Sequence, residues 1–357
     1  MRTILAAGVV VLVSTSAAHA QKPMASSAPR VAPRLAPVTV APTLRARLAS
    51  KSRFDASKLS VTYRGDVPVL KLKNGRSYKL VSNAEPIEPV AVTPAVVPEI
   101  AKRKAAIEAW RPGIRPDLGG ARVAIRSHVS TQTPVKDQGP RGSCVAFSNL
   151  AGMEAWLKRN QNVTKDLSEN HAHELFMAVG GGTCDPDKGV GLKSMLTLRS
   201  NGVCAESLFP YTSTCPTSVP AECSGATDRV RITSLYPMSF PDMPNTPQFN
   251  ALNTATLEAL IDSDLDIEYS IKIAGSDWSD GTASTGVIDV QTYSNGDPVG
   301  AIGSHGILLV GYNRPGSYFI FKNSWGTDWG HAGYGHVSYD YIETYGRYGY
   351  AIAAVGP

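Results

Sequence analysis

One stretch, PVKDQGPRGSCVAFSNLAGMEAW from Pro134 to Trp156, constrains the fold of this chain more than any other. Its first half is rich in glycine and polar residues, and its second half carries apolar residues at helical spacing. The pattern predicts a helix capped by Ser143 and running to about Arg159. The core face of that helix consists of Phe147, Leu150, Ala151 and Leu157. Cys144 would lie in the first turn, where backbone N–H groups and the helix dipole favour a thiolate.

From about Leu118 onward the chain has the apolar patterning of a packed domain, with predicted helices first and predicted strands later. Further helices are expected over residues 168–179 and 192–201. Strand patterns follow at 267–273, 286–293, 305–313, 317–325 and 334–342. Because the two kinds of element do not alternate, the pattern predicts an α+β domain. The stretch DSDLDIE, 262–268, is interpreted as an acidic turn because it lacks the ligand spacing of a calcium loop.

The first twenty residues, MRTILAAGVVVLVSTSAAHA, have the order of a secretory signal. Arg2 supplies the positive charge, residues 4–13 the apolar segment, and residues 18–20 an A-x-A cleavage site. An anchoring helix is the alternative, but the apolar run is short for a membrane span. We therefore expect a secreted or periplasmic protein with no stable membrane association.

The segment between the signal and the packed domain divides into two parts. Residues 21–58 are rich in Ala, Pro and Ser and are expected to be disordered. Residues 59–116 begin with apolar and polar residues alternating around Asn74-Gly75, which predicts a β-hairpin over 59–82. A proline-rich strap follows, and a short helix is predicted over 100–110.

Charge is distributed unevenly along the chain. Residues 21–116 hold 18 Lys and Arg against 6 Asp and Glu, while residues 117–357 hold 16 against 24. Nucleic-acid binding is disfavoured because the basic residues are scattered and lack interleaved aromatic residues. The front segment is then either a solvated leader or a segment that docks on the acidic domain.

The chain contains five cysteines, an odd number. Export favours disulfides, and one thiol is left over, for which Cys144 is the natural candidate. Three connectivities remain open for Cys184, Cys204, Cys215 and Cys223. No Cys or His pair has convincing metal-site spacing, and we expect neither a metal nor an organic cofactor.

Cys144 needs a proton acceptor, and His305 in GSHGILLVGY is the candidate because a strand end can hold its ring. Asn323 in FKNSWGTDWG can accept from the imidazole and orient it. Gln138 and the Cys144 N–H could together bind the oxyanion of a tetrahedral intermediate. A lone Cys or His is more often structural, so only the combination points to nucleophilic catalysis.

Three blocks, QGPRGSCVAFS, SHGILLVGY and KNSWGTDWGHAGYGHV, resemble in order the signature blocks of the papain-like (cathepsin-type) cysteine peptidases. The resemblance covers about residues 134–341. It implies a two-subdomain fold in which a helical subdomain carries Cys144 and a strand-rich subdomain carries His305 and Asn323. Cys144 would be the nucleophile, His305 the base, Asn323 the orienting residue and Gln138 the oxyanion donor.

The resemblance also suggests where substrate binds and where this chain departs from the family. The expected substrate-binding residues are Gly142, Ser143, Gly189, Gly191, Ser304 and Trp325. Trp325 would also cover the His305–Asn323 contact. The family usually has Cys three residues before the nucleophile, but this chain has Arg141, so the usual loop disulfide is absent. Arg141 could select a substrate carboxylate or be a solvent-exposed loop charge.

The expected function is therefore that of a secreted thiol peptidase that forms an acyl-enzyme and is made as a zymogen. Residues 59–116 would be a non-standard pro-region that inhibits the catalytic domain, 117–357, within the same molecule. Two alternatives stay open, a non-hydrolytic scaffold that binds peptide or wall material and an acyl transferase on the same fold. The expected partners are protein or peptide substrates and the pro-region, and we expect a monomer.

Overall fold

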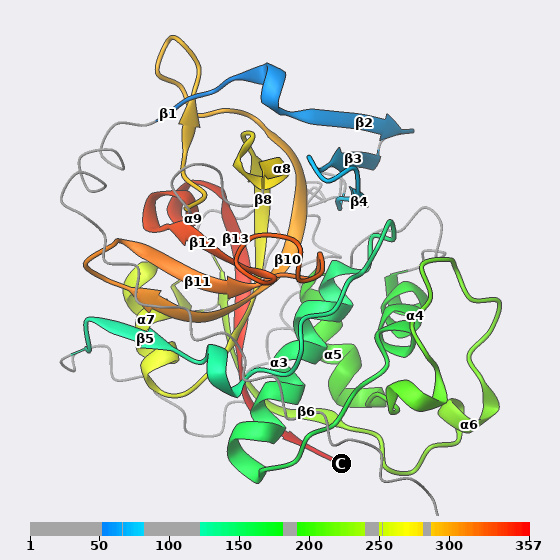
Figure 1. The fold of residues 1–357 in the computed structure, drawn as a ribbon. Helices are drawn as coiled ribbons and strands as arrows, with labels where there is room; N and C mark the ends of the chain where they lie inside the picture. The colour runs from blue at the N-terminus through cyan, green and yellow to red at the C-terminus, as the bar shows by residue number, and fades with distance from the viewer. Residues whose placement is uncertain are drawn as a thin grey trace, which may run out of the picture. The chain divides into compact units, whose positions relative to one another are not determined.

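Figure 1 shows the computed structural model, which describes residues 52–65, 67–81, 122–180, 191–239, 250–251, 253–280 and 287–357. The chain divides into Met1–Ala32 and Pro33–Pro357, and all described residues belong to the second unit. The signal, the proline-rich strap and the helix expected over 100–110 lie outside the described residues. None of the described helices is long and apolar enough to cross a bilayer.

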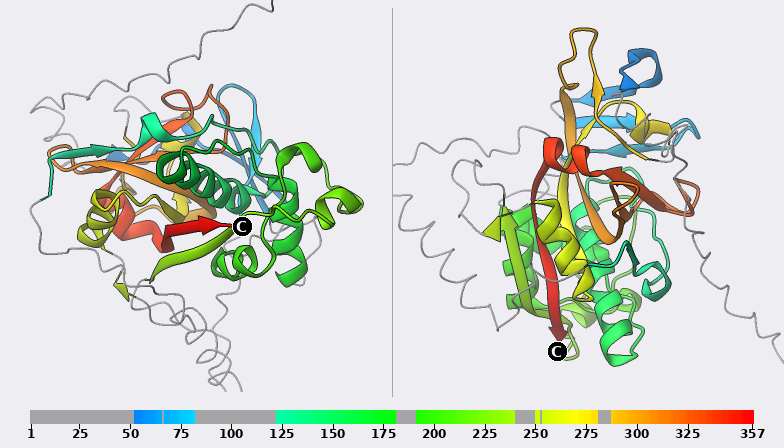
Figure 2. Two further views of the ribbon diagram at one scale, coloured as in Figure 1. Left: turned by 90° about the horizontal axis from the view of Figure 1, so that it is seen from below. Right: turned by 90° about the vertical axis from the view of Figure 1, so that its left-hand side faces the viewer.

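The three helices predicted for the first half of the domain are confirmed as α3 (Cys144–Gln161), α4 (Glu169–Gly180) and α5 (Gly191–Asn201). They gather on one side, and α3 contacts the sheet (Figures 1 and 2). Ser143 occupies the N-cap position of α3, but its side chain makes no capping hydrogen bond. The helix ends at Asn162, whose left-handed backbone lets its N–H donate to the Leu157 carbonyl.

An eight-stranded sheet forms the second half of the domain. Its strands occur in the spatial order β12 (Tyr334–Ser338), β11 (Tyr318–Lys322), β10 (Ala301–Asn313), β8 (Ile267–Ala274), β13 (Gly346–Gly356), β6 (Arg231–Ser239) and β7 (Asn250–Ala251), and β5 (Ile125–Ser127) also pairs with β10. All pairings are antiparallel except that of β6 with β7. Helices followed by an antiparallel sheet confirm the α+β class.

Two strand predictions were wrong in part. Of the predicted segment 286–293 the structure describes residues 287–293, and only β9 (Gln291–Thr292) is a strand there, because the Asp289 side chain accepts from the next backbone N–H and from Ser338. The segment 334–342 divides at Ser338, whose hydroxyl accepts from the Tyr341 N–H and caps helix α9 (Tyr339–Tyr345).

Several short elements had no counterpart in the sequence predictions. They are η2 (Val129–Thr131), η3 (Glu206–Leu208), α6 (Ala221–Ser224), α7 (Thr254–Asp262) and α8 (Asp277–Asp280). Helix α7 does carry a readable start signal, since the Asn253 side chain accepts from the Thr256 N–H. Its apolar residues Leu257, Leu260 and Ile261 have helical spacing and are buried.

The basic front segment, residues 21–116, is the leader of this chain. It contains a small sheet of its own, formed by β2 (Ser60–Arg64), β3 (Val67–Lys71) and β4 (Ser77–Lys79). Strands β3 and β4 form the hairpin predicted around Asn74-Gly75, with Leu70 opposite Tyr78. Residues 52–58, part of the segment expected to be disordered, contain β1 (Ser52–Arg53) and η1 (Ala56–Lys58). Two contacts account for this order: β1 pairs with β9, and the Asp55 side chain caps η1.

The leader sheet shares a hydrophobic core with the domain. Its buried side chains Leu70, Leu72, Tyr78 and Leu80 belong to the same cluster as Trp278 and Trp325. Full burial of one such side chain contributes about 1.5–3 kcal/mol. The described part of the leader is therefore a docked element and not a solvated tail.

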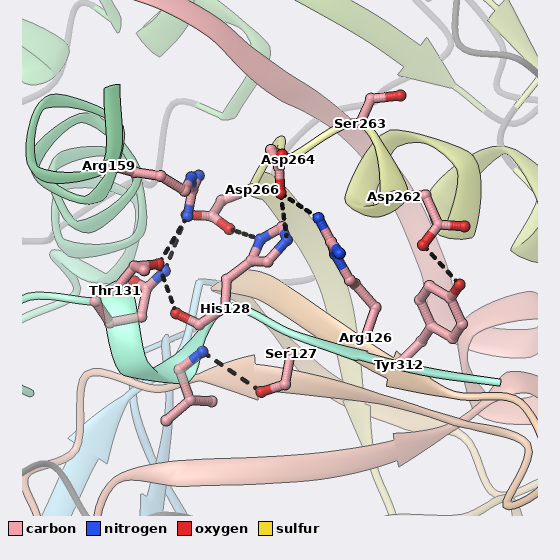
Figure 3. Close-up of polar contacts among 12 residues, drawn as sticks. Arg126, Ser127, His128, Thr131, Arg159, Asp262, Ser263, Asp264, Asp266 and Tyr312 are labelled. Atoms are coloured by element: carbon pink, nitrogen blue, oxygen red, sulfur yellow. Dashed lines mark hydrogen bonds and ion pairs between the residues drawn. The ribbon is translucent and has the colours of Figure 1, made fainter. Parts of the chain in front are cut away.

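Figure 3 shows how the acidic turn before β8 attaches the first strand of the domain. The buried Asp266 carboxylate accepts from His128 at 2.7 Å, Gln132 at 2.9 Å and Arg159 at 3.0 Å. Asp264 pairs with Arg126. These carboxylates are neutralised by cationic and polar side chains, which agrees with an acidic turn.

Glu268 on β8 is fully buried beneath α3. One carboxylate oxygen accepts from Ser148 Oγ at 3.1 Å, and the other has no partner among the described residues. Burial raises the pKa of Glu268 to about 8, and the Ser148 hydrogen bond offsets only part of that effect. Because the folded state holds this proton more tightly than the unfolded state, stability falls as pH rises from about 4.5 through 8.

We therefore expect Glu268→Gln to raise the melting temperature by several degrees at pH 8–9 and to have little effect at pH 5. The ionised carboxylate costs on the order of several kcal/mol, since each tenfold change in proton affinity is about 1.4 kcal/mol. Differential scanning calorimetry across this pH range measures the difference. Glu258→Gln is the matched control and should destabilise: burial alone would raise the pKa of Glu258, but hydrogen bonds from Arg314, Tyr339 and Arg122 together outweigh it and lower that pKa. Parallel curves for wild type and Glu268→Gln would contradict the assignment.

Candidate active site

The start of α3 and strand β10 come into direct contact at Gly306. A Cβ atom added at Gly306 would lie 3.2 Å from Val145 Cα and 3.3 Å from the carbonyl carbon of Cys144. These are backbone atoms that cannot move aside easily, so the close approach requires glycine. The contact brings His305, the preceding residue, to the first turn of the helix that carries Cys144.

His305 and Asn323 are hydrogen-bonded to each other. His305 Nε2 lies 2.7 Å from Asn323 Oδ1, and the same oxygen accepts from the Ser324 N–H at 2.8 Å. Nε2 must therefore carry the proton, because a carbonyl oxygen only accepts. The other ring nitrogen, Nδ1, is buried with no hydrogen-bond partner among the described residues. It is the basic nitrogen of the neutral ring.

Trp325 covers this pair. Its side chain is fully buried, and its ring centroid lies 4.6 Å from that of His305. Trp278 packs edge-on against the imidazole at 6.1 Å. Burial lowers the pKa of His305 to about 4, although the hydrogen bond to Asn323 acts in the opposite direction. The imidazole is thus neutral near pH 7 and able to accept a proton.

Gln138 is held at both its backbone and its side chain. Its N–H donates to the Ser324 carbonyl at 2.8 Å, and its Oε1 accepts from Ser324 Oγ at 2.6 Å. Nε2 donates one hydrogen to the Arg141 carbonyl at 2.8 Å. An amide nitrogen carries two hydrogens, so a second N–H of Gln138 remains for an incoming oxygen.

A buried ionic cluster lies beneath the same loop. Lys136 Nζ contacts Glu169 at 2.7 Å and Glu154 at 3.2 Å. Lys322 donates to the carbonyl of Thr133 at 2.9 Å, and burial lowers its pKa to about 8. The cluster joins the segment leading to Gln138 to α3, α4 and β11, which fixes the base of the loop.

The substrate-binding residues predicted from the resemblance have different surroundings. Ser304 pairs with Val81 of the leader through two backbone hydrogen bonds, of 2.8 and 2.9 Å. Gly142 and Ser143 are buried beside Cys144, and Gly191 is the first residue of α5. Gly189 lies outside the described residues.

Arg141 is buried and does not serve as a solvent-exposed loop charge. Its guanidinium donates to Asn170 at 2.5 Å and to the Thr212 carbonyl at 3.1 Å, and it lies 3.5 Å from Glu174. Only 3% of the residue is exposed. Because these contacts already occupy the guanidinium, the suggestion that Arg141 selects a substrate carboxylate was wrong.

Cys144 is not part of a disulfide, as predicted. Cys204 and Cys223 form a disulfide, and Cys215 is also disulfide-bonded, while Cys184 lies outside the described residues. The sequence reading overlooked that His171, Cys204 and Cys223 hold their potential ligand atoms within 4.8 Å of one another. The two sulfurs are bonded to each other and the His171 Nδ1 accepts from the Cys204 N–H, so this group serves as a structural contact.

Three residues near the site were missed by sequence reasoning. Val81 packs in one hydrophobic cluster with Cys144 and Val145, and Tyr78 stacks on Trp325 with ring centroids 5.0 Å apart. Tyr211 contacts the loop before Cys144. The strings around them, SYKLV and GVCAESLFPY, carry no local signal for such long-range contacts.

Comparison with known proteins places these features in a family. The family model described as papain family cysteine protease matches residues 120–355. A KDEL-tailed cysteine endopeptidase of Arabidopsis thaliana is 28% identical over 237 residues, which is 63% of this chain and 56% of that protein. A cysteine proteinase of Dictyostelium discoideum is 28% identical over 216 residues, which is 57% of this chain and 56% of that protein. The matches thus span little more than half the length of these relatives.

The fold has a similar solved structure in xylellain, a cysteine protease from Xylella fastidiosa. The TM-score is 0.56 at 19% identity, and the match covers 69% of this chain and 91% of that chain. At this identity the likeness concerns the fold. Since the family model matches most of the chain, and its match includes the helix and the strand that meet at Gly306, the chain belongs to the papain family of cysteine proteases.

Proposed function

We propose that this protein is a cysteine peptidase that hydrolyses peptide bonds with Cys144, His305 and Asn323. The observation that carries the proposal is the orientation of His305. Its Nε2 is hydrogen-bonded to Asn323, and its Nδ1 has no hydrogen-bond partner among the described residues. His305 also lies in the strand that contacts the Cys144 turn. A neutral imidazole held in this way can accept a proton from a neighbouring nucleophile, which supports the proposal.

The reaction follows from these positions. The Cys144 thiol transfers its proton to His305 Nδ1, and the sulfur attacks the carbonyl carbon of the peptide. The oxygen of the tetrahedral intermediate binds the Gln138 amide and the Cys144 N–H. His305 returns the proton to the leaving amine, and an acyl-enzyme forms. Water then attacks the thioester with His305 as base, which releases the acid and restores the thiol.

We also propose that the leader inhibits the enzyme until it is cleaved. Val81 forms two backbone hydrogen bonds with Ser304, the residue before His305. Tyr78 stacks on Trp325 and donates from its hydroxyl to the Trp325 carbonyl at 3.1 Å. With the leader docked, His305 is 1% exposed and Cys144 is fully buried, so a substrate carbonyl has no access to the sulfur.

Glycine and charge complementarity help the leader to bind. A Cβ atom at Gly303 would lie 2.7 Å from the Leu80 Cβ, so this strand leaves room for Leu80. Arg76 forms ion pairs with Asp137 at 2.9 Å and Asp328 at 3.0 Å. Because all three side chains are largely exposed, these pairs contribute little compared with apolar burial. They link the basic leader to the acidic domain.

We propose export of the protein through its first twenty residues. The support is the order of charge, apolar run and A-x-A site in the sequence, together with the Cys204–Cys223 disulfide, which is favoured in an oxidising compartment. Fractionation of expressing cells tests this, since an exported chain should lose its first twenty residues. Retention of an uncleaved N-terminus inside the cell would argue against it.

The peptidase proposal is tested by labelling the thiol. The full chain is incubated at several pH values, and processing, peptide hydrolysis and iodoacetamide labelling are followed together. We expect the rate of labelling at Cys144 and the peptidase activity of unlabelled enzyme to rise together as the leader is removed. Enzyme that has been labelled at Cys144 should no longer hydrolyse peptides. A thiol that resists labelling after processing favours a scaffold, and products that contain an added amine favour acyl transfer. Full activity of the uncut chain would remove the zymogen proposal.

A further inference from the structure

The loop from Gln138 to Ser143 carries or adjoins both proposed oxyanion donors, yet it lacks the disulfide that papain-like enzymes usually have there. Arg141 stands at the position of the missing cysteine. The loop is instead held by contacts to Tyr211, which follows η3 in a different part of the helical half. These contacts converge on a single phenol group.

The hydroxyl of Tyr211 lies between the two ends of this loop. It donates to the Gln138 carbonyl at 2.7 Å. It also lies 2.6 Å from Ser143 Oγ, the side chain that precedes Cys144. A phenol has one hydrogen, so Ser143 must be the donor in the second contact. The Ser143 side chain is therefore tied to Tyr211, and it makes no capping hydrogen bond to α3.

The ring of Tyr211 makes two further contacts with the same region. It packs edge-on against Phe147 with centroids 4.7 Å apart. The Arg141 guanidinium lies over the ring at 5.3 Å, a cation–π geometry. Tyr211 thus contacts the loop at its first residue, its middle, its last residue and the helix that follows.

Tyr211 is itself held firmly in place. Its N–H donates to Glu206 at 2.6 Å, and the carbonyls of the two preceding residues accept from Asn170 and Ser168, both at 2.6 Å. Asn170 also accepts from Arg141, so Tyr211 and Arg141 share an anchor at the start of α4. Arg141, Asn170 and the segment ending at Tyr211 therefore contact one another in a closed network, and Arg141 occupies the position of the absent cysteine.

We propose that Tyr211 is a positioning residue whose hydroxyl sets the separation between the Gln138 amide and the Cys144 N–H. This inference depends on the proposed peptidase function, because it concerns the oxyanion formed in that reaction. Such donors act only when they lie about 2.7–3.1 Å from the oxygen, so a small shift of the loop weakens both. The hydroxyl controls the spacing because it is hydrogen-bonded to Gln138, which carries one donor, and to Ser143, which directly precedes the residue with the other donor.

The test compares Tyr211→Phe with wild type after removal of the leader. We expect kcat/KM for a peptide substrate to fall about tenfold or more, since loss of a whole oxyanion donor costs about 10²–10³. Alkylation of Cys144 by iodoacetamide should stay within about twofold, because displacement at a saturated carbon forms no oxyanion. Tyr312→Phe is the matched control, as its hydroxyl also makes two polar contacts, to the Val123 carbonyl and the Asp262 carboxylate, and lies outside the site. Equal losses of hydrolysis and alkylation, or no loss, would overturn the proposal.

A double-variant comparison tests the mechanism. Gln138→Ala should lower kcat/KM, and Tyr211→Phe should have little further effect in that background, because the main donor it positions is gone. Equal effects in both backgrounds would contradict a role through Gln138. If Tyr211→Phe folds poorly, Ser143→Ala replaces it in the test, because this substitution removes the second contact of the Tyr211 hydroxyl without disturbing the ring. In Ser143→Ala, too, kcat/KM should fall while the alkylation rate of Cys144 changes little.

A measurement independent of activity separates this inference from the proposed function. Hydrogen exchange of the full chain should be faster in Tyr211→Phe within residues 138–144 and unchanged in β10 and β11. If wild type neither hydrolyses peptides nor reacts at Cys144, the peptidase function fails, and the exchange data still decide whether Tyr211 holds the loop. Unchanged exchange in residues 138–144 would overturn the structural part of the proposal.

Discussion

Replacing His305 with alanine is expected to lower kcat/KM for peptide hydrolysis by at least about 10³-fold. His305 precedes Gly306, which contacts the Cys144 turn, and its Nδ1 has no hydrogen-bond partner among the described residues. Without it, the thiol of Cys144 has no group to accept its proton, and the leaving amine has no donor. Steady-state kinetics with the processed enzyme measure the effect.

His331→Ala provides a control, since this exposed histidine packs on His336 and not on the site. It should keep activity within about twofold, as is usual for surface substitutions. Added imidazole should restore part of the activity of His305→Ala, because the substitution leaves a ring-sized space beside Asn323. Retention of more than about a tenth of wild-type activity by His305→Ala would rule out its role as base.

Much of the site could be predicted because its residues lie in local patterns. Cys144 follows a glycine-rich approach and opens a helix with regular apolar spacing, and that helix is confirmed. His305 directly precedes the apolar run of β10, although that strand begins earlier, at Ala301, and Asn323 directly follows β11. The structure brings these elements together, whereas the catalytic roles stay predictions.

Other elements gave weak local signals. Strand β6 contains Pro237, which argues against an interior strand, although it pairs with Tyr350 of β13. Strand β13, GRYGYAIAAVG, is rich in Gly and Ala, which have low strand propensity. Both are strands because neighbours in the sheet satisfy their backbones, and this information is not local.

The contacts of single side chains could not be predicted from the sequence, because they too depend on residues far away along the chain. Arg141 invited an interpretation as a surface or substrate-binding charge, because a sequence does not reveal which carboxylates or rings surround it. Its actual partners, Asn170, Glu174 and Tyr211, come from other parts of the chain. The hairpin of the leader was predictable from Asn74-Gly75, but its docking on Trp325 and Ser304 depends on three-dimensional complementarity.

Replacing Val81 with proline is expected to expose Cys144 in the uncut chain. Proline has no N–H, so the 2.9 Å hydrogen bond to the Ser304 carbonyl is lost and that carbonyl is left without its partner. Loss of the bond together with the unsatisfied acceptor costs about 2–3 kcal/mol, before any clash of the ring. At about 1.4 kcal/mol per tenfold change, the leader should leave the site about 10²-fold more often.

The measurement is the rate of iodoacetamide labelling of Cys144 in full-length chains, followed by intact mass so that processed molecules are counted separately. Val81→Ala is the matched variant: it keeps both backbone bonds and removes only part of the side chain, so its labelling rate should rise much less. The contrast matters because neither substitution changes Leu70, Leu72 and Tyr78, the apolar side chains that pack the hairpin against the domain. A faster rate confined to Val81→Pro would therefore locate the inhibition in the backbone pairing with Ser304. Equal rates in both variants would instead assign it to apolar burial alone.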